Sequence, residues 1–251
     1  MELRDRVAIV TGGATGAGWS IVLRLVDEGV AVVVADVADV AGEAAVAAIS
    51  ERGGSGSFVR TDVRVDGDVE HMITFAEERH GGVDILVNNA GGWGPTANYP
   101  YASPLQWGST LDLNLRAPML ATQLVLEPMR RRGGGAVVNV ASTGGVGLAP
   151  YVSPEYGAAK AGLIRFTACM AYAREETGVR VNCVVPDWIA TERAHGELAA
   201  MTPEDRAAEA PLVDPGDLAD AIVELIRDES LSGRVVLLPR GEPRRLLDPA
   251  E

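Results

Sequence analysis

The strongest constraint on the fold is a recurring series of short apolar runs separated by amphipathic segments. These runs occupy residues 7–10, 30–36, 58–62, 84–90, 136–142, 179–185 and 234–238. Most are continuous rather than alternating, as is typical of parallel strands covered on both faces. Between them, residues such as Val69, Met72, Ile73 and Ala76 recur at helical spacing. The series predicts an α/β fold, with one doubly wound domain over residues 1–251 and a mostly parallel sheet of about seven strands.

Composition narrows the classes of function. A chain of 251 residues with 47% hydrophobic residues suits one sizeable domain. Its formal charge of −13 argues against nucleic-acid binding, which requires a basic surface. No apolar run approaches the ~18 residues that span a bilayer, and the charged N-terminus does not resemble a signal peptide. We therefore expect neither a nucleic-acid partner nor a membrane partner.

The cysteines and histidines give weaker indications. Cys169 and Cys183 both lie in apolar segments, which predicts buried, reduced thiols and favours a cytoplasmic protein. His71, His80 and His195 are scattered without the spacing of metal ligands, so no metal site is expected.

A glycine-rich loop follows the first predicted strand. The stretch TGGATGAG places Gly12, Gly16 and Gly18 before a helical pattern, where backbone N–H groups can approach a pyrophosphate. Asp36 ends the second predicted strand, where a carboxylate can accept hydrogen bonds from an adenosine ribose and repel a 2′-phosphate. No cation adjoins Asp36 in the sequence, which favours NAD over NADP. The alternative is an exposed aspartate at a strand end with no ligand.

The segment YGAAK contains the only lysine among the 22 basic residues of the chain. Tyr156 and Lys160 are four residues apart, so they share one face if the segment is helical. Taken with the glycine spacing G-x3-G-x-G, the stretch NNAG at 88–91 and Ser142, the chain resembles the short-chain dehydrogenase/reductase family. The resemblance extends from Arg6 to about Leu238.

The resemblance implies a Rossmann-type domain that binds NAD and transfers a hydride to or from a small-molecule alcohol or ketone. Tyr156 would be the catalytic acid/base, and Ser142 would bind the substrate oxygen. Lys160 would hold the nicotinamide ribose and lower the pKa of Tyr156. Asn114 would anchor a water that links Lys160 to solvent, although the residue could instead satisfy backbone groups alone.

Other roles also follow from the resemblance. The cofactor would contact Gly12, Thr15, Gly16, Ala17, Gly18, Asp36, Asp62, Val63, Asn88, Ala90, Gly91, Tyr156, Lys160, Pro186, Ile189 and Thr191. The substrate would contact Ser142, Tyr156, Trp93, Tyr151 and Trp188, whose aromatic rings suit an apolar or cyclic molecule. Residues 187–215 are the least regular part of the chain and are expected to form a flexible flap.

Two residues of the chain depart from the family pattern, and two other functions remain as alternatives. Asp187 follows Pro186 where the family usually has glycine, and Ala17 replaces a larger aliphatic residue. A non-catalytic NAD-binding regulator would be expected to lack part of the set Asn114, Ser142, Tyr156 and Lys160. An epimerase or dehydratase on a related fold would usually have a different glycine spacing and a longer C-terminal region. The resemblance also implies a homotetramer or homodimer, assembled through helices near 108–131 and 153–177.

Overall fold

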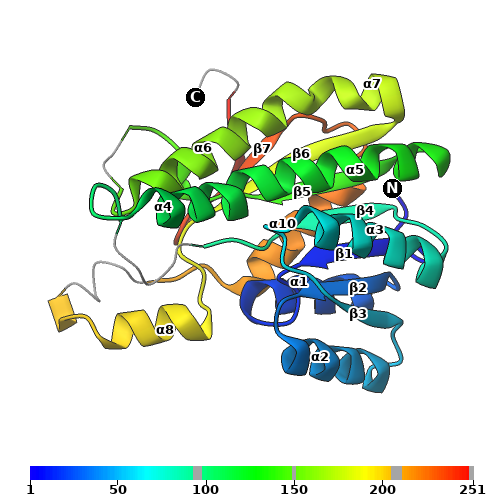
Figure 1. Ribbon diagram of the computed structural model, residues 1–251, viewed down its shortest axis with the longest axis horizontal. Coiled ribbons are helices and arrows are strands. Elements are labelled where there is room, and N and C mark those ends of the chain that lie inside the picture. The colour runs from blue at the N-terminus through cyan, green and yellow to red at the C-terminus, as the bar shows by residue number, and fades with distance from the viewer. Residues whose placement is uncertain (93–97, 149–150, 205–210, 249–251) are drawn as a thin grey trace.

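The computed structural model describes residues 1–92, 98–148, 151–204 and 211–248. Within them the strands form one sheet in the order β3-β2-β1-β4-β5-β6-β7-β8 (Figure 1). All neighbouring strands are parallel except β7 and β8, which are antiparallel. The strands are β1 (Val7–Thr11), β2 (Ala31–Asp36), β3 (Gly56–Arg60), β4 (Ile85–Asn88), β5 (Gly135–Val140), β6 (Val179–Pro186), β7 (Val235–Leu238) and β8 (Arg245–Leu246).

Helices cover both faces of this sheet because alternate strand residues point to opposite sides. Val10 and Val34 pack with α1, α2 and α10, whereas Ile9 and Val33 pack with α3 and α5. Leu163 of α6 packs on Cys183 and Val185 of β6. The helices are α1 (Gly16–Asp27), α2 (Asp39–Glu51), α3 (Asp66–His80), α4 (Pro104–Leu111), α5 (Ala117–Arg131), α6 (Pro154–Cys169), α7 (Ala173–Thr177), α8 (Glu192–Ala199) and α10 (Pro215–Arg227).

The predicted fold class is confirmed, with one strand more than expected. All seven apolar runs form parallel strands, although β3 begins two residues before the predicted run. The helical residues Val69, Met72, Ile73 and Ala76 are buried on α3, as their spacing predicts. β8 has only two residues, both exposed, which is too short a run to produce a hydrophobic pattern.

The two long helical regions contain local irregularities. Between α4 and α5 the chain forms a π-helix over Asp112–Arg116, and between α6 and α7 it forms a 3-10 turn over Met170–Tyr172. Single-turn π segments inside α-helices frequently mark functional sites. Here the π segment carries the buried Asn114.

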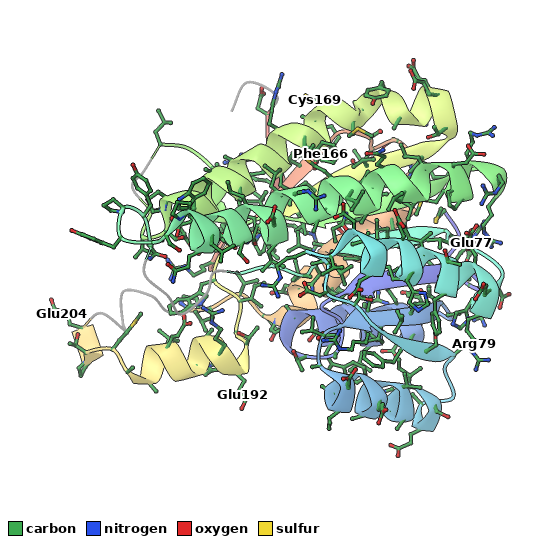
Figure 2. All side chains as sticks on the ribbon, in the orientation of Figure 1. Glu77, Arg79, Phe166, Cys169, Glu192 and Glu204 are labelled. Carbon is green, nitrogen blue, oxygen red and sulfur yellow. The ribbon has the colours of Figure 1, made fainter. Side chains whose placement is uncertain are left out.

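Both cysteines are free thiols, but only one is buried. Cys183 is fully buried, whereas Cys169 is exposed on the outer side of α6 (Figure 2). The expectation of two buried thiols is therefore wrong for Cys169, because the buried face of α6 is formed by Lys160, Leu163 and Thr167. Across the described ranges, no helix is both long enough and apolar enough to cross a membrane.

β1 and β4 are parallel neighbours at the centre of the sheet. The order of the strands along the chain reverses there, because β2 and β3 lie on one side of this pair and β5, β6 and β7 on the other. In doubly wound sheets, ligands bind beyond the carboxyl ends of the strands at such a switch point. Thr11, Asn88 and Val140 end β1, β4 and β5 at this edge. The fold therefore gathers the loops that follow these strands around one place.

Candidate active site

A cleft of about 900 Å³ opens at the carboxyl edge of the sheet. Its lining comes from the loops after the strands, from α6 and from the segment beyond β6. The sequence-predicted residues that line it are Gly12, Thr15, Gly16, Ala17, Gly18, Asp36, Ala90, Gly91, Ser142, Tyr151, Tyr156, Lys160, Pro186, Trp188, Ile189 and Thr191. Trp93 lies outside the described residues.

The glycine loop lies at one end of the cleft with little room for side chains. Gly12 has a φ of 62°, and a Cβ on Gly18 would lie 1.9 Å from the Gly12 carbonyl oxygen. Asn89 fixes the loop from β4, because its Nδ2 donates to the carbonyls of Thr11 and Gly12 at 2.8 and 3.1 Å. The close packing of backbone here matches what a pyrophosphate requires at the N-terminus of α1.

Asp36 lies beside this loop at the end of β2. Its carboxylate accepts hydrogen bonds from the backbone N–H groups of Ala14 at 3.0 Å and Ala38 at 3.1 Å. The sheet also pairs Asp36 with Arg60 of β3, a cation that is remote in the sequence. The Arg60 guanidinium forms an ion pair with Asp39 at 3.7 Å. The surroundings of Asp36 thus contain an arginine that the sequence pattern does not reveal.

Tyr156 and Lys160 lie one turn apart on α6, as predicted, and both are buried. The Lys160 Nζ is 5.6 Å from the centroid of the Tyr156 ring and donates to the Val140 carbonyl at 2.8 Å. A Cβ on Gly91 would lie 3.0 Å from this Nζ and 2.9 Å from the Asn114 Oδ1. Glycine at position 91 therefore lets the lysine and the asparagine approach the backbone of the NNAG loop.

Ser142 lies between two tyrosines at the end of β5. Both Tyr156 and Tyr151 form side-chain hydrogen bonds with Ser142, and their rings stack with centroids 5.8 Å apart. The Ser142 Oγ also accepts from the Gly144 N–H at 3.2 Å. The structure therefore brings one serine hydroxyl and two phenols together at a single point of the cleft.

Burial governs the ionisation of the pair on α6. It raises the pKa of Tyr156 well above its ordinary value, and the hydrogen bond with Ser142 partly opposes this rise. Burial also lowers the pKa of Lys160 to about 8. Desolvation is the largest influence on both groups. The lowered tyrosine pKa that the resemblance implies stays a prediction for the protein with NAD bound.

Asn114 is fully buried behind Gly91 rather than in the wall of the cleft. Its Nδ2 donates to the carbonyls of Gly92 at 2.7 Å and Thr110 at 2.9 Å, and its Oδ1 accepts the Gly92 N–H at 2.9 Å. The side chain therefore fixes the loop after β4, which agrees with the alternative that it satisfies backbone groups.

Three other predicted cofactor contacts also lie apart from the cleft lining. The Asn88 side chain points into the core, where its Nδ2 donates to the Asn139 Oδ1 at 2.8 Å. Asp62 forms an ion pair with Arg64 at 2.7 Å, which lowers the pKa of its carboxyl group. Val63 is buried against α3. Of the two asparagines of NNAG, it is Asn89 that lines the cleft, together with Ala90 and Gly91.

The segment after β6 closes one side of the cleft. Thr191 caps α8 by accepting the Ala194 N–H at 3.2 Å, and a Cβ on Gly16 would lie 3.5 Å from its methyl group. Asp187, which replaces the usual glycine, forms an ion pair with Arg240 at 3.0 Å. Arg240 follows β7 and has no motif around it, so only the fold places it here.

Charged and sulfur-bearing residues that sequence reasoning missed also line this side. They are Glu192, Arg193, Glu197, Met201 and Arg240. No group of three metal-ligating side chains occurs among the residues that the structure describes.

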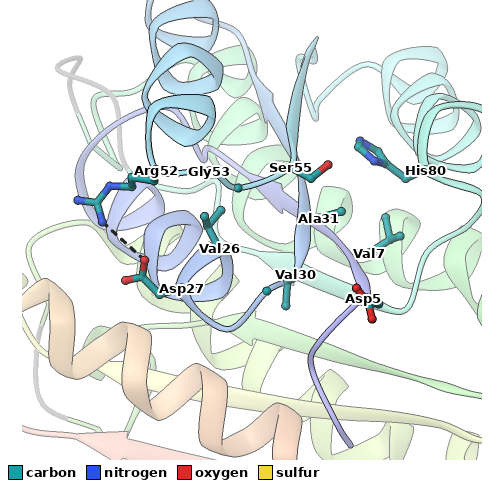
Figure 3. A pocket seen from close by; sticks show the side chains of 12 residues that line it. Asp5, Val7, Val26, Asp27, Val30, Ala31, Arg52, Gly53, Ser55 and His80 are labelled. Atoms are coloured by element: carbon teal, nitrogen blue, oxygen red, sulfur yellow. Dashed lines mark ion pairs between the residues drawn. The ribbon is translucent and has the colours of Figure 1, made fainter.

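A second hollow, of about 590 Å³, lies at the opposite edge of the sheet, where β1 and β2 begin (Figure 3). It is lined by Asp5, His80 and an ion pair between Asp27 and Arg52 at 3.6 Å, among other residues. The His80 Nε2 forms a hydrogen bond with Ser57 at 2.8 Å. Because none of the predicted site residues reaches this hollow, the candidate active site is the larger cleft.

Comparison with known proteins agrees with this geometry. The family described as short chain dehydrogenase matches residues 6–201. The chain therefore belongs to the short-chain dehydrogenase/reductase family of oxidoreductases, which use a nicotinamide cofactor.

Individual relatives match most of the chain. Cis-4-hydroxycyclohexanecarboxylate dehydrogenase of Sinomonas cyclohexanicum is 36% identical, over 89% of this chain and 90% of that protein. Levodione reductase of Leifsonia aquatica is 34% identical, over 82% of this chain and 78% of that protein. A solved structure of 7 alpha-hydroxysteroid dehydrogenase, complexed with NADH and 7-oxo glycochenodeoxycholic acid, has a TM-score of 0.87 at 28% identity and covers 98% of both chains.

Proposed function

We propose that this protein is an NAD-dependent alcohol dehydrogenase or carbonyl reductase that acts on an apolar or cyclic secondary alcohol or ketone. The observation that carries this proposal is the convergence of Ser142, Tyr156 and Lys160 on one cleft whose other end is the glycine loop. Dehydrogenases of cyclic alcohols among its relatives support the substrate class. The close backbone packing at Gly12, Gly18 and Gly91 fits a dinucleotide.

The protein groups would manage the proton and orient the reactants. A bound nicotinamide supplies the hydride acceptor or donor. The Ser142 hydroxyl would donate a hydrogen bond to the substrate oxygen, and the Tyr156 oxygen would take the proton from an alcohol or return it to a ketone. Asn114 would keep the loop after β4 in place through its two hydrogen bonds to Gly92, rather than touching the substrate.

The charge of Lys160 has a definite task in this mechanism. A free tyrosine has a pKa of about 10, so proton exchange near neutrality needs a decrease of about three units. Burial of Tyr156 acts in the opposite direction. An ammonium ~5 Å away contributes roughly 3 kcal/mol at an effective dielectric constant of ~20. Since burial lowers the pKa of Lys160 to about 8, the lysine carries this charge at neutral pH and loses it in alkali.

Replacing Asp36 with alanine is expected to weaken NAD binding by about 10-fold and to reduce the preference for NAD over NADP by at least that factor. The variant loses the ribose acceptor and the charge that repels a 2′-phosphate. Arg60, its neighbour on β3, would then favour that phosphate. Dissociation constants for both dinucleotides provide the measurement.

The control for Asp36 is Asp27→Ala, which changes the net charge equally at the opposite edge of the sheet. In this control variant the dissociation constants of NAD and NADP should equal those of wild type. A wild-type protein that already prefers NADP would contradict the assignment of Asp36.

Replacing Trp188 with alanine is expected to raise KM for a bulky cyclic substrate by about 10-fold, because a buried aromatic contact of roughly 1.5 kcal/mol or more is lost. NAD affinity should change by less than about twofold. Trp107→Ala on α4 is the control, since Trp107 is exposed and lies outside the cleft. Equal changes in substrate and NAD affinity would instead assign Trp188 to the cofactor site.

Three further features are proposed together with the activity. The described start of the predicted flap, residues 187–204, borders the substrate and moves as it enters, since Trp188, Thr191 and Arg193 all line the cleft; residues 205–210 of the predicted flap lie outside the described residues. Exposed apolar residues on the helical face, Met119 and Tyr172, support assembly as a homodimer or homotetramer. The two free thiols support a cytoplasmic location.

The test of the activity is a panel of cyclic and acyclic secondary alcohols, each mixed with the protein and NAD while the absorbance of the reduced nicotinamide is followed. Turnover of at least one cyclic alcohol, faster with NAD than with NADP, is the expected result. If the protein binds NAD but no alcohol in the panel raises the absorbance of the reduced nicotinamide, the result would favour a non-catalytic regulator.

A further inference from the structure

A chain of buried polar side chains crosses the sheet below the cleft. It joins Asn88 of β4 to Asn139 of β5 at 2.8 Å, and Asn139 to Thr167 of α6 at 2.9 Å. All three residues are buried, and none of them lines the cleft. The mechanism proposed above uses none of these groups, although polar side chains are costly to bury unless their hydrogen bonds are made.

Each hydrogen bond in this chain has a defined donor. The Asn139 Nδ2 donates to the Thr167 Oγ1, and that hydroxyl donates in turn to the Leu163 carbonyl at 2.9 Å. The Thr167 hydroxyl also forms a hydrogen bond with the thiol of Cys183. Cys183 belongs to β6 and stands opposite Asn139 in the sheet. Thr167 therefore holds α6 to β5 and β6 at the same time.

Thr167 lies on the same face of α6 as the proposed catalytic residues. It follows Lys160 by about two helical turns, and both are buried on that face together with Tyr156. Two polar contacts thus join β5 to α6. The Val140 carbonyl accepts the Lys160 Nζ at 2.8 Å, and Asn139, the residue before Val140, donates to Thr167. These two contacts are roughly 10 Å apart along the helix.

The same two elements carry the groups that would meet the substrate. Ser142 follows β5 and Tyr156 belongs to α6, and their side chains share a hydrogen bond. The distance between them depends on how α6 is placed along β5. Apolar side chains such as Leu163 pack α6 on β6, but apolar contact has no preferred direction. A hydrogen bond has one, with a donor–acceptor distance of about 2.7–3.2 Å, so Asn139 and Thr167 can fix the helix where apolar packing cannot.

The alternative is that the chain of hydrogen bonds only stabilises the core. Its loss would then lower Tm and leave the site of the folded protein unchanged. Apolar groups of the same shape would serve stability about as well, because the net gain from a buried hydrogen bond is small. Stability alone therefore gives no reason for an amide and a hydroxyl at these two positions, whereas the need for a fixed direction does.

We propose that Asn139 and Thr167 are positioning residues for the reaction. They fix α6 on β5, so that Tyr156 and Lys160 keep their places relative to Ser142. Neither residue touches the substrate, and each acts through the helix. This inference rests on the proposed function, since it concerns the geometry of the same site.

Two replacements of Thr167 separate position from stability. Thr167→Val keeps the size of the side chain and removes the hydroxyl, whereas Thr167→Ser keeps the hydroxyl and removes a methyl group. Both should lower Tm by a few degrees, the first through the unsatisfied amide of Asn139 and the second through the lost apolar contact. Only Thr167→Val should lower kcat for a cyclic alcohol, by about 10-fold or more, with KM and NAD affinity within about twofold of wild type.

A second measurement needs no turnover, because Lys160 is the only lysine of the chain. Lysine labelled with carbon-13 at its ε-carbon therefore gives one side-chain NMR signal in the whole protein, and its titration reports the pKa of Lys160. Wild type and Thr167→Ser should both have a pKa of about 8. In Thr167→Val the pKa should lie about half a pH unit or more higher, since a displaced helix exposes the ammonium to water.

The double replacement of Asn139→Leu with Thr167→Val tests the same idea in a core without an unsatisfied amide. The Asn88 Nδ2 retains the Thr122 Oγ1 and the Pro118 carbonyl, each at 3.3 Å. The Tm of the double variant should therefore exceed that of Thr167→Val, while its kcat stays about 10-fold or more below wild type. A kcat that recovers together with Tm would mean that the chain of hydrogen bonds serves stability alone. If Thr167→Val does not fold, the double variant replaces it in both measurements.

The outcomes distinguish this inference from the proposed activity. Wild-type kcat together with a wild-type lysine pKa in Thr167→Val, or an equal loss of kcat in Thr167→Ser, would overturn the positioning role. If no alcohol is turned over, the dehydrogenase is contradicted and the labelled lysine decides the inference by itself. A raised pKa in Thr167→Val alone would then support it, and equal pKa values in wild type and both variants would overturn it.

Discussion

Replacing Tyr156 with phenylalanine is expected to reduce kcat/KM for a cyclic alcohol by about 10²–10⁴-fold, the range that a positioned acid/base contributes. The change removes one oxygen from a buried ring that stacks on Tyr151, so packing should be preserved. NAD affinity should stay within about twofold, because the phenol acts on the proton. Initial rates and NAD dissociation constants provide the measurement.

The control is Tyr151→Phe. Tyr151 shares the hydrogen bond with Ser142 and lines the same cleft, so both variants remove the same chemical group a few ångströms apart. Tyr151→Phe should lower kcat/KM by about 10-fold at most, as expected for one lost hydrogen bond. The opposite order of effects would transfer the acid/base role to Tyr151.

Replacing Lys160 with arginine is expected to reduce kcat/KM by about 100-fold or more, even though the charge is kept. The Lys160 Nζ is buried between the Val140 carbonyl at 2.8 Å and the backbone of Gly91. A guanidinium is broader than an ammonium and has a fixed planar shape. It cannot occupy the same position without displacing the NNAG loop.

Arg165→Lys on the outer face of α6 is the control for this exchange, and it should have wild-type rates because Arg165 is exposed. Near-wild-type rates in Lys160→Arg would mean that the lysine provides only a charge. They would contradict the positional role of its ammonium.

Lys160→Met separates catalysis from stability. The pKa of Lys160 is lowered from 10.5 to about 8, so burial penalises the charged form. The penalty is absent above pH 10.5, grows as the pH falls, and is complete below about pH 8. The penalty is on the order of 3 kcal/mol, and Lys160→Met removes it. The variant also loses the hydrogen bond to Val140, which reduces this gain in stability by about 1 kcal/mol.

The methionine variant should therefore melt several degrees higher than wild type near neutral pH, without cofactor, while being nearly inactive. The difference in Tm should shrink as the pH approaches 10.5. A lower Tm for the variant, or a difference that does not vary with pH, would contradict the buried charge.

The sheet was predictable because its central strands are buried on both faces and hence continuously apolar. The edge strand β3 begins with Gly56 and Ser57, which carry no apolar signal, so its start was misplaced. The face of α6 was misassigned at Cys169 because the surrounding segment is apolar, although Leu163 and Thr167 define the buried side.

The site was predictable where a motif fixes the local backbone. The glycine loop, Ser142, Tyr156 and Lys160 lie in one cleft. Within NNAG, the two neighbouring asparagine side chains point in opposite directions. That of Asn88, at the end of β4, faces the core, and that of Asn89 donates to the backbone of the glycine loop. Arg60, Arg193 and Arg240 belong to no motif, and only the pairing of strands and the path of the flap bring them near the site.

The most direct test of the central claim is to follow a labelled hydride. A cyclic secondary alcohol with deuterium on its carbinol carbon is incubated with the protein and NAD, and the nicotinamide product is analysed by mass spectrometry and NMR. Transfer of deuterium to the C4 position of the nicotinamide, abolished in Tyr156→Phe and kept in Tyr151→Phe, is the predicted result. Reduced nicotinamide without deuterium, or labelling that persists in Tyr156→Phe, would contradict the proposed hydride transfer with Tyr156 as its acid/base.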